Sequence, residues 1–510
     1  MAGAESHTVW VHPGVPQGFF PVPLPGTERL NFECSMSMTF PGPLDEKRLI
    51  AAYEETLRSF PHATGRLRRK DNDWTLGPST RGVPLTFATT SEPWDHYHYP
   101  AEYPAHLMDT VAIDLARAFD PAYDEPMLRC KVTYCPTSNE TIIAWSSCHI
   151  IGDGSFIYHF HHIWSQAYQG KKPLFGPPTY EKYRTAPADE HVDNPDTAAF
   201  RDNHLSHLAK LYPMEEWVGM ATAAQAGTVQ VDLLFTAHQI QQLRLVADLS
   251  PTTGATSAQD ALSAYLITVL NRVLAVPITR VSSMLGYRGG RNPPSLPPSE
   301  WHIPGPHAVG NAIFQAHTPH LTTAQASSIA VVSRTIRASI TAARDYAHIK
   351  RLVAISEPIW RRQSEESLEH QFWPAEDEGR FVFNSMPKAD WSASHFGYGA
   401  DKARAVIYGS FAGYARVFKP SAVKQADGTW VTDTKADPSD PDVHEWKVNT
   451  AAKNPNDGAL WLFVRVPTAA RDAFLAAVAA DLMSPGFPQN LVRREREVQA
   501  RILEGARAKL

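Results

Sequence analysis

The spacing of apolar residues predicts the first elements of the chain. In residues 30–40, apolar side chains occupy every second position and polar side chains lie between them. This period of two predicts a strand with one buried face. The sequence Pro-Gly-Pro at 41–43 ends the strand, and apolar residues then recur at helical spacing, at Leu49, Tyr53 and Leu57. We therefore expect a half-buried strand and then an amphipathic helix to about residue 60.

The same criteria predict alternating strands and helices over the rest of the chain. We expect a hairpin across 70–73, a second hairpin made of 128–135 and 141–148, strands at 229–235, 281–287 and 460–466, and helices at 257–274 and 468–482. Residues 185–228 read as a helix plus an interdomain crossover, and residues 419–458 as a solvated excursion. Mixed strands and helices indicate an α/β protein.

Length and composition narrow the class of protein. A chain of 510 residues is long for a single core, so we expect two domains, at 1–215 and 216–510. With 43% hydrophobic and 20% charged residues, the chain has the composition of a soluble globular protein. A net charge of −5 gives no electrostatic case for nucleic acid, and no apolar run is long enough for a membrane span. The N-terminal residues lack the pattern of a signal peptide.

The cysteines predict a reduced protein. Cys34, Cys130, Cys135 and Cys148 show no CxxC pairing, and each lies in or beside an apolar strand pattern. A reducing compartment with intact thiols is therefore expected. Cys148 directly precedes a histidine, but neighbours on a strand point to opposite faces, which argues against Cys148 as a nucleophile.

The stretch from Ser146 to Gly154 carries the strongest candidate chemistry. It follows the apolar run 142–145, which predicts a strand buried on both faces, and it precedes apolar residues at helical spacing. Within it, His149 lies at the mouth of the strand, ahead of a Gly-Asp-Gly turn. Imidazole titrates near neutral pH and suits proton transfer. The alternative is a hydrogen-bonded histidine with no catalytic role, since the chain holds 22 histidines.

Several motifs together resemble one enzyme family. The pattern His-x-x-x-Asp-Gly from His149 to Gly154 resembles the signature of the BAHD acyltransferases, within the wider chloramphenicol-acetyltransferase and condensation-domain superfamily. The order of further motifs resembles the same family: Pro61 to Leu67, a strand followed by Arg288, a proline-rich segment and Gly310-Asn311, then Asn384-Ser385-Met386, and His395-Phe396-Gly397-Tyr398-Gly399. His395, Tyr398 and Met386 replace the family's Asp, Trp and Trp, and Gly286 replaces an Asp. These departures resemble the fungal, trichothecene-acetyltransferase-like members.

The resemblance implies a fold and a reaction. The implied fold has two chloramphenicol-acetyltransferase-like domains, each a mixed sheet with flanking helices, and an active-site channel at their interface. The implied reaction transfers an acyl group from acyl-coenzyme A, a co-substrate rather than a bound cofactor, to a hydroxyl or amine of a small specialised metabolite. The family's Asp in the Phe-Gly-Trp-Gly motif pairs with an Arg, and its replacement by His395, together with Gly286, makes that salt bridge uncertain here.

The resemblance also implies roles for single residues. His149 would be the general base, and Asp153 would fix its loop while pointing away from substrate. Asn384 and Ser385 would stabilise the oxyanion, although they also suit a turn at a strand end. Ser257, Lys402 and Arg404 are candidates for the coenzyme A phosphates. Ser257-Ala258-Gln259-Asp260 equally fits a capping box at a helix start.

Two other functions use the same motifs. A condensation-like or cyclase enzyme of natural-product biosynthesis would use the same cleft with carrier-bound substrates, although no carrier domain is attached here. A binding protein without catalysis would fit if the altered motifs reflected decay. A metal site is not expected, because His159, His161 and His162 lack further donors and read as solvated helix histidines. We expect a monomer.

The last three residues resemble a targeting signal. Ala508-Lys509-Leu510 differs from the peroxisomal tripeptide Ser-Lys-Leu only by Ser→Ala. The preceding residues, 493–507, read as a charged helix that would hold the tripeptide in solvent. The prediction is peroxisomal import through the receptor for this signal, and a cytoplasmic location otherwise.

Overall fold

The computed structural model describes most of the chain. Described are all residues outside the ranges 1–5, 31, 72, 92–110, 115–116, 119, 121, 174–175, 184, 191–193, 209–210, 250–255, 367–369, 373–378, 388, 390, 400–403, 408–411, 421–422, 425–429, 432–457 and 508–510. The Tyr- and His-rich segment 91–105 and the excursion 419–458 therefore fall almost wholly outside the described residues, as do Lys402 and the C-terminal tripeptide.

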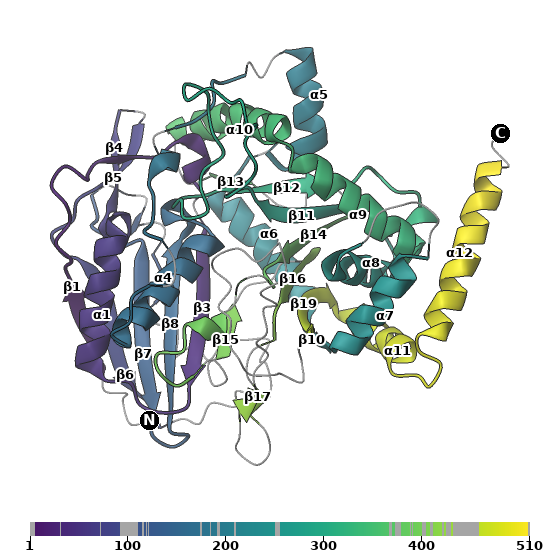
Figure 1. Ribbon diagram of the computed structural model, residues 1–510, viewed down its shortest axis with the longest axis horizontal. Coiled ribbons are helices and arrows are strands. Elements are labelled where there is room, and N and C mark those ends of the chain that lie inside the picture. The colour runs from purple at the N-terminus through teal and green to yellow at the C-terminus, as the bar shows by residue number, and fades with distance from the viewer. Residues whose placement is uncertain are drawn as a thin grey trace.

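A six-stranded mixed sheet carries the His149 motif. Across it lie β1 (Ser6–Val11), β6 (Val83–Thr89), β7 (Leu128–Cys135), β8 (Glu140–Cys148), β3 (Glu33–Phe40) and β15 (Arg404–Ile407). Only β6 and β7 run parallel. Helices α1 (Glu46–Ser59) and α4 (Gly154–Tyr168) lie against each other over one face (Figure 1). The predicted first helix and the hairpin that leads to His149 are confirmed.

A small three-stranded sheet accompanies the first half of the chain. It consists of β2 (Val22–Pro23), β5 (Asp73–Gly77) and β4 (Arg66–Lys70), so the predicted hairpin across 70–73 is confirmed. The motif from Pro61 to Leu67 runs into β4, and the side chain of its Arg66 is buried. That guanidinium donates to the carbonyl oxygens of Thr64, Gly82 and Asp124 at 2.6–2.9 Å. A buried cation is tolerated here because backbone oxygens satisfy its donors.

A second six-stranded mixed sheet forms from the other half of the chain. Its order is β10 (Thr228–Phe235), β19 (Leu460–Pro467), β16 (Tyr414–Phe418), β14 (Arg380–Ser385), β11 (Arg280–Gly286) and β12 (Ile313–His317). Its apolar core also takes residues from α7 (Ala237–Ala247), α8 (Ala258–Leu270), α9 (Ile329–Ala343) and α11 (Arg471–Leu482). The three strands and the two helices predicted here are confirmed, although α8 ends four residues early and α11 starts three residues late.

The remaining elements connect and flank the two sheets. They are α5 (Pro195–His204), α6 (Met214–Ala226), α10 (Tyr346–Glu366), α12 (Gln489–Arg507), β9 (Leu211–Pro213), β13 (His370–Phe372), β17 (Val423–Lys424) and β18 (Trp430–Val431). Figure 1 shows α12, the predicted charged helix, at the edge of the molecule farthest from the first sheet. Among the described helices, none is both long and apolar enough to span a bilayer.

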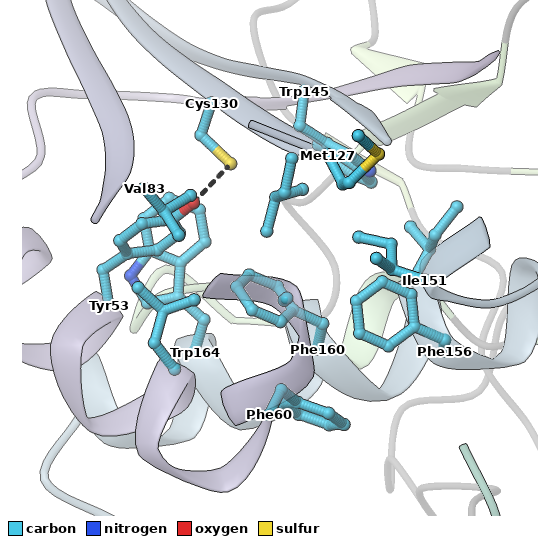
Figure 2. Close-up of a cluster of buried hydrophobic side chains, with 14 of the residues drawn as sticks. Tyr53, Phe60, Val83, Met127, Cys130, Trp145, Ile151, Phe156, Phe160 and Trp164 are labelled. Carbon is cyan, nitrogen blue, oxygen red and sulfur yellow. Dashed lines mark hydrogen bonds between the residues drawn. The ribbon is translucent and has the colours of Figure 1, made fainter. Parts of the chain in front are cut away.

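The first core is rich in aromatic side chains. Tyr53, Phe60, Phe160 and Trp164 fill the space between the sheet and its two helices, with their rings 4.9–5.7 Å apart (Figure 2). The Tyr53 hydroxyl donates to the Cys130 thiol at 3.4 Å. Burying such rings removes a large apolar area from water, at roughly 25 cal/mol per Å².

A strand from the second half completes the first sheet. β15 pairs antiparallel with β3, with Val406 opposite Ser37. As a result β3 lies inside the sheet, between β8 and β15, and its hydroxyl side chains Ser37 and Thr39 are buried. The prediction of a half-buried strand at residues 30–40 was therefore wrong. No local pattern could reveal a neighbour that arrives more than 360 residues later.

The three helix histidines are buried, so the expectation of solvated side chains was also wrong. α4 faces the first sheet on one side and segments of the second half on the other. The His161 ring stacks on Trp145, with centroids 3.3 Å apart, and Tyr158 contacts Trp391. Burial lowers the pKa of His159 to about 3 and that of His162 to about 4, so both are neutral at pH 7. No metal-binding cluster of His, Cys, Asp or Glu occurs in the described part of the chain.

The His395–Gly399 motif anchors the second half onto the first. Phe396 packs on Trp164 and Phe40, and its backbone N–H donates to the Ser165 hydroxyl at 2.9 Å. His395 Nδ1 accepts from the backbone N–H groups of Gly397 and Gly399 at 3.1 and 3.3 Å. An imidazole thus caps this turn, where the BAHD motif that it resembles has an Asp.

We expect Ser165→Ala to destabilise the protein by about 1–3 kcal/mol, because the buried N–H of Phe396 would lose its acceptor. Urea unfolding measures the change. The matched control is Ser339→Ala, since the Ser339 hydroxyl bonds only within its own helix. That control should stay within about 0.5 kcal/mol of the original protein. Equal changes in the two variants would contradict an anchoring role for the motif.

Candidate active site

The backbone around His149 is fixed by its neighbours. His149 begins a single 3-10 turn at the end of β8, and its N–H donates to the Phe32 carbonyl oxygen at 2.9 Å. Gly152 follows with φ of 140°, where a Cβ would lie 2.6 Å from Cβ of Phe156. Glycine is therefore required at this turn, both for its conformation and for the lack of a side chain. The spacing of His149, Gly152 and Asp153 therefore fixes the position of the imidazole at the end of β8.

Asn311 orients the imidazole of His149 from the other half of the chain. Its Nδ2 lies 2.7 Å from the His149 carbonyl oxygen, and its Oδ1 lies 2.9 Å from His149 Nδ1. A carbonyl oxygen can only accept, so Nδ2 must donate to it, and Oδ1 must accept from Nδ1. In the neutral ring the proton therefore sits on Nδ1, and Nε2 keeps its lone pair. This is the tautomer that a general base requires.

Glu28 holds Asn311 in place, and Lys182 pairs with Glu28. Glu28 accepts from the Asn311 backbone N–H at 2.6 Å, and Lys182 Nζ lies 2.5 Å from the other carboxylate oxygen. Both side chains are buried. Burial raises the pKa of Glu28, although Lys182 opposes the shift. A Cβ at Gly310 would lie 2.8 Å from Glu28, so this position also requires glycine.

Cys34 lies beside the end of β8, where it pairs with Ser147, two residues before His149. The Phe32 ring also packs on the imidazole, with centroids 4.0 Å apart. Burial lowers the pKa of His149, but Cys34, Asn311 and Asp153 outweigh it and hold that pKa above its usual value.

Asp153 points into the protein and joins the two halves. One carboxylate oxygen accepts from the Ser155 N–H at 3.0 Å and caps α4. The other accepts from Arg288 at 2.6 Å and from the Ala312 N–H at 3.0 Å. Burial would raise the pKa of Asp153, but Arg288 and these hydrogen bonds hold it below its usual value. The sequence left the ion-pair partner of Arg288 uncertain. In the structure that partner is Asp153.

Asn384 and Ser385 lie at the end of β14, where its tip approaches the start of α4. Met386 Sδ lies 3.3 Å from the place that a Cβ on Gly154 would take. Both polar residues are half-buried. On the neighbouring strand, burial raises the pKa of Tyr414, although Arg416 and Asn384 oppose the shift. Among the contacts of the described residues, no hydrogen bond joins Asn384 or Ser385 to His149.

The residues predicted for coenzyme A lie apart from this cluster. The Ser257 hydroxyl accepts from the Asp260 N–H at 3.2 Å, and Asp260 accepts from the Ser257 N–H at 2.8 Å. The predicted capping box is therefore confirmed, and Asp260 also pairs with Arg337. Arg404 begins β15, opposite Thr39, and Lys402 lies outside the described residues. The structure does not bring Ser257 to His149.

Sequence reasoning missed the roles of Glu28 and Lys182 and the position of Cys34 beside the end of β8. Asn311 was part of the motif series, but the sequence carried no sign that it reaches His149. The position of Cys34 depends on strand register, because Cys34 pairs with Ser147, two residues before His149. A register between segments more than 100 residues apart is not visible in local patterning.

We expect Asn311→Ala to lower kcat about 10- to 100-fold, because a lost hydrogen bond to a charged group costs about 1.5–3 kcal/mol. The KM for the substrate should change little. Since Asn311 raises the pKa of His149, the acidic limb of the rate–pH profile should move to lower pH. Stopped-flow or steady-state kinetics across pH 5–9 measure both effects. A change confined to KM would contradict orientation of the base.

Known structures share this fold. Vinorine synthase matches with a TM-score of 0.60 at 14% identity, over 94% of this chain and 98% of that one. TRI101 of F. sporotrichioides, complexed with coenzyme A and T-2, gives 0.60 at 16% identity, over 91% and 97%. TRI101 of F. graminearum, with coenzyme A and T-2 mycotoxin, gives 0.56 at 12%, over 90% and 97%. This chain has their fold.

The likeness spans nearly the full length of both chains, so the two-sheet arrangement is common to all of them. It confirms, for the fold, the resemblance to BAHD acyltransferases that the motif order indicated. No protein-family profile matches the sequence, and no curated protein matches it either. The side chains around His149 therefore indicate the chemistry.

Proposed function

We propose that this protein transfers an acyl group from acyl-coenzyme A to a hydroxyl or amine of a small metabolite, with His149 as the base. The observation that carries the proposal is the oriented imidazole. Asn311 holds Nδ1 at 2.9 Å in the donor role, which leaves the Nε2 lone pair for a proton. The fold adds support, because coenzyme A is bound in the structures of TRI101.

The reaction needs one group to carry a proton both ways. His149 Nε2 takes the proton of the acceptor as its oxygen or nitrogen attacks the thioester carbonyl. The tetrahedral intermediate then expels the thiolate of coenzyme A, which takes the proton from the imidazolium. A positioned acid–base group of this kind contributes about 10²- to 10⁴-fold in rate. The Asp153 carboxylate fixes the loop and does not reach the substrate.

Other site roles belong to the same proposal. Asn384 and Ser385, at the tip of β14 near the start of α4, are proposed donors to the oxyanion, and one such donor contributes about 3–4 kcal/mol. Lys402 and Arg404 are proposed contacts for the coenzyme A phosphates. Ser257 has less support, because its hydroxyl and its helix N-terminus are already engaged in the capping box.

A donor and acceptor screen tests the proposal. Acetyl-, long-chain and aromatic acyl-coenzyme A would each be combined with alcohols and amines, including T-2 and deoxynivalenol, which TRI101 structures contain. A colorimetric thiol assay measures the coenzyme A that is released. Mass spectrometry identifies the product and distinguishes esters from amides. Acyl-pantetheine thioesters form a further arm for carrier-dependent chemistry. Acceptor-dependent product from pantetheine thioesters alone would contradict coenzyme A as the donor.

We also propose peroxisomal import through Ala508-Lys509-Leu510. The support is the likeness of this tripeptide to Ser-Lys-Leu. Full-length protein with an N-terminal fluorescent tag, expressed with and without the last three residues, tests the proposal. A diffuse signal from the intact chain would contradict it.

A further inference from the structure

Asn311 lies between a buried carboxylate and the imidazole of His149. Its Nδ2 donates to the His149 carbonyl oxygen at 2.7 Å, and its Oδ1 accepts from His149 Nδ1 at 2.9 Å. On the other side, Oε2 of Glu28 lies 3.2 Å from the same Nδ2 and accepts from the Asn311 backbone N–H at 2.6 Å. The amide therefore connects the carboxylate to the ring, with both Nδ2 hydrogens engaged.

The carboxyl group of Glu28 is ionised. Oε2 faces two N–H groups of Asn311, and Oε1 faces Lys182 Nζ at 2.5 Å, so both oxygens lie against donors and a carboxyl proton would have no acceptor. Burial would lower the pKa of Lys182, but Glu28 outweighs it, and the ammonium is charged at pH 7. The two side chains are 0% and 6% exposed. This buried ion pair has its negative end at Asn311.

Backbone contacts fix the position of the Glu28 carboxylate. Glu28 ends the 3-10 turn Gly26–Glu28, and the N–H groups of Gly26 and Thr27 donate to the carboxylate of Glu357 on α10. A Cβ at Gly26 would lie 2.2 Å from the Glu357 carbonyl oxygen, so the turn packs directly against that helix. The turn is thereby held in one position, with its last side chain against the amide.

A carboxylate on the nitrogen side of an amide strengthens the oxygen side as an acceptor. It draws the amide toward the dipolar form in which the oxygen carries more negative charge, and successive hydrogen bonds of this kind reinforce one another. Oδ1 of Asn311 then holds the Nδ1–H of an imidazolium more strongly than that of a neutral ring, because a charged donor makes the stronger bond. The protonated form of His149 is stabilised, and Nε2 becomes a stronger base.

We propose that Glu28, paired with Lys182, is a positioning residue that acts through Asn311 to set the basicity of His149. This inference rests on the proposed role of His149 as the base, and it deepens that role by naming the group that sets the proton affinity of Nε2. The observation that carries it is the unbroken series of contacts from Lys182 through Glu28 and Asn311 to the imidazole.

A second buried ion pair lies on the other side of residues 310–312. Asp153 pairs with Arg288 and accepts from the Ala312 N–H at 3.0 Å, while Arg288 donates to the Gly310 carbonyl oxygen. Asp153 also raises the pKa of the candidate base. This pair stays unchanged in the variants described below, so it does not account for a difference between them.

Other titratable groups face the series as well. Tyr183 and Tyr287 lie within electrostatic reach of the buried carboxylate, and burial raises the pKa of both phenols, so they are neutral at pH 7. On β3, burial raises the pKa of the Cys34 thiol, but His149 and Arg416 outweigh it and hold that pKa below its usual value. These groups also stay unchanged in the variants.

An NMR titration of His149 in the full-length protein tests the proposal. The protein carries isotope-labelled histidine, and the His149 signal is the one that His149→Ala lacks. Glu28→Gln keeps an oxygen for the N–H groups of Asn311 but removes the charge. The pKa of His149 should fall by about 0.5–1 unit, the size expected when a hydrogen bond loses part of its ionic character. In the rate–pH profile, the acidic limb should move to lower pH by the same amount, with little change in KM.

A double variant separates basicity from stability. Glu28→Gln alone leaves the Lys182 ammonium buried without a counter-charge, so the unfolding temperature should fall. Adding Lys182→Gln removes that charge and allows the two new amides to pair. The unfolding temperature should then recover while the pKa of His149 stays low. If the single variant does not fold, the double variant carries the test.

The matched control is Glu495→Gln. Glu495 is another buried carboxylate that holds backbone N–H groups, those of Ile329 and Ala330 at the start of α9. It lies on α12, at the edge of the molecule farthest from the first sheet (Figure 1). This variant should lose stability but leave the pKa of His149 within about 0.2 unit, because distant sites act independently.

The outcomes separate this inference from the proposed function. An unchanged pKa of His149 in both Glu28 variants would overturn the inference, and so would an equal fall in Glu495→Gln. Acyl transfer together with an unchanged pKa would leave the proposed function standing. A lowered pKa in a protein that transfers no acyl group, with any donor and acceptor, would support the link from Glu28 to His149 and overturn the proposed function.

Discussion

His149→Ala is expected to lower kcat for acyl transfer by about 10³-fold, with little change in the KM for acyl-coenzyme A. The reason is that, among the described residues of the site, Nε2 of His149 is the oriented atom that can accept and return the proton. Such a general acid–base group contributes about 10²- to 10⁴-fold in rate. Steady-state release of coenzyme A, with product detection by mass spectrometry, measures the loss.

The control for this variant is His302→Ala. His302 is exposed and bonds only the Glu300 carbonyl oxygen through its ring, so its removal should leave kcat within about twofold. Thermal unfolding should show both variants folded. Turnover by His149→Ala at the original rate would contradict the assignment of His149 as the base.

Asp153→Ala is expected to destabilise the protein by about 3–5 kcal/mol, because it leaves a buried guanidinium without its carboxylate. Arg288 is bonded to Asp153 at 2.6 Å, and both side chains are nearly inaccessible to solvent. Activity should fall as well, since Asp153 also holds Ala312, the neighbour of the residue that orients His149. Denaturant unfolding and kcat measure the two effects.

The matched control is Asp472→Ala, which removes a solvent-exposed ion pair with Arg471. Exposed pairs contribute about 0–1 kcal/mol, so this variant should unfold almost as the original protein does. Similar losses in Asp153→Ala and Asp472→Ala would contradict a structural ion pair between the halves.

The Asp153 contribution should depend on pH in a defined direction. Its pKa is lowered in the folded protein, whereas the unfolded value is about 3.9. The stabilisation is therefore present above pH about 4 and is lost as the pH falls through the folded pKa. The unfolding free energy of the original protein should exceed that of Asp153→Asn by a constant amount from pH 7 to 5. That difference should narrow below pH 4.

Local patterning determined the elements with regular spacing. The sequence predicted the hairpin of β7 and β8 at 128–135 and 141–148, within one residue of the observed bounds, because apolar runs and a turn of polar residues mark it directly. The turn at Gly152 was also visible, since glycine beside a tight turn is a local signal. The α8 capping box followed from four adjacent residues. Each of these depends on forces between residues close in sequence.

Patterning failed where distant segments meet. Ser37 and Thr39 read as exposed polar positions, but β15 makes β3 an interior strand. His159, His161 and His162 read as solvated, but the first sheet and segments of the second half cover α4. Burial of a polar side chain depends on what lies against it, and the sequence alone does not place that neighbour.

For the site, the sequence determined that a histidine stands at a strand end with an aspartate at a fixed distance, and the order of motifs pointed to the fold. Only the tertiary structure decided what each of these groups does. Asn311 selects the tautomer of His149, and Arg288 fixes Asp153. These contacts join segments more than 100 residues apart. Hydrogen bonding and charge act over a few ångströms in space, whatever the distance along the chain, so the protonation and reactivity of the site belong to the folded molecule.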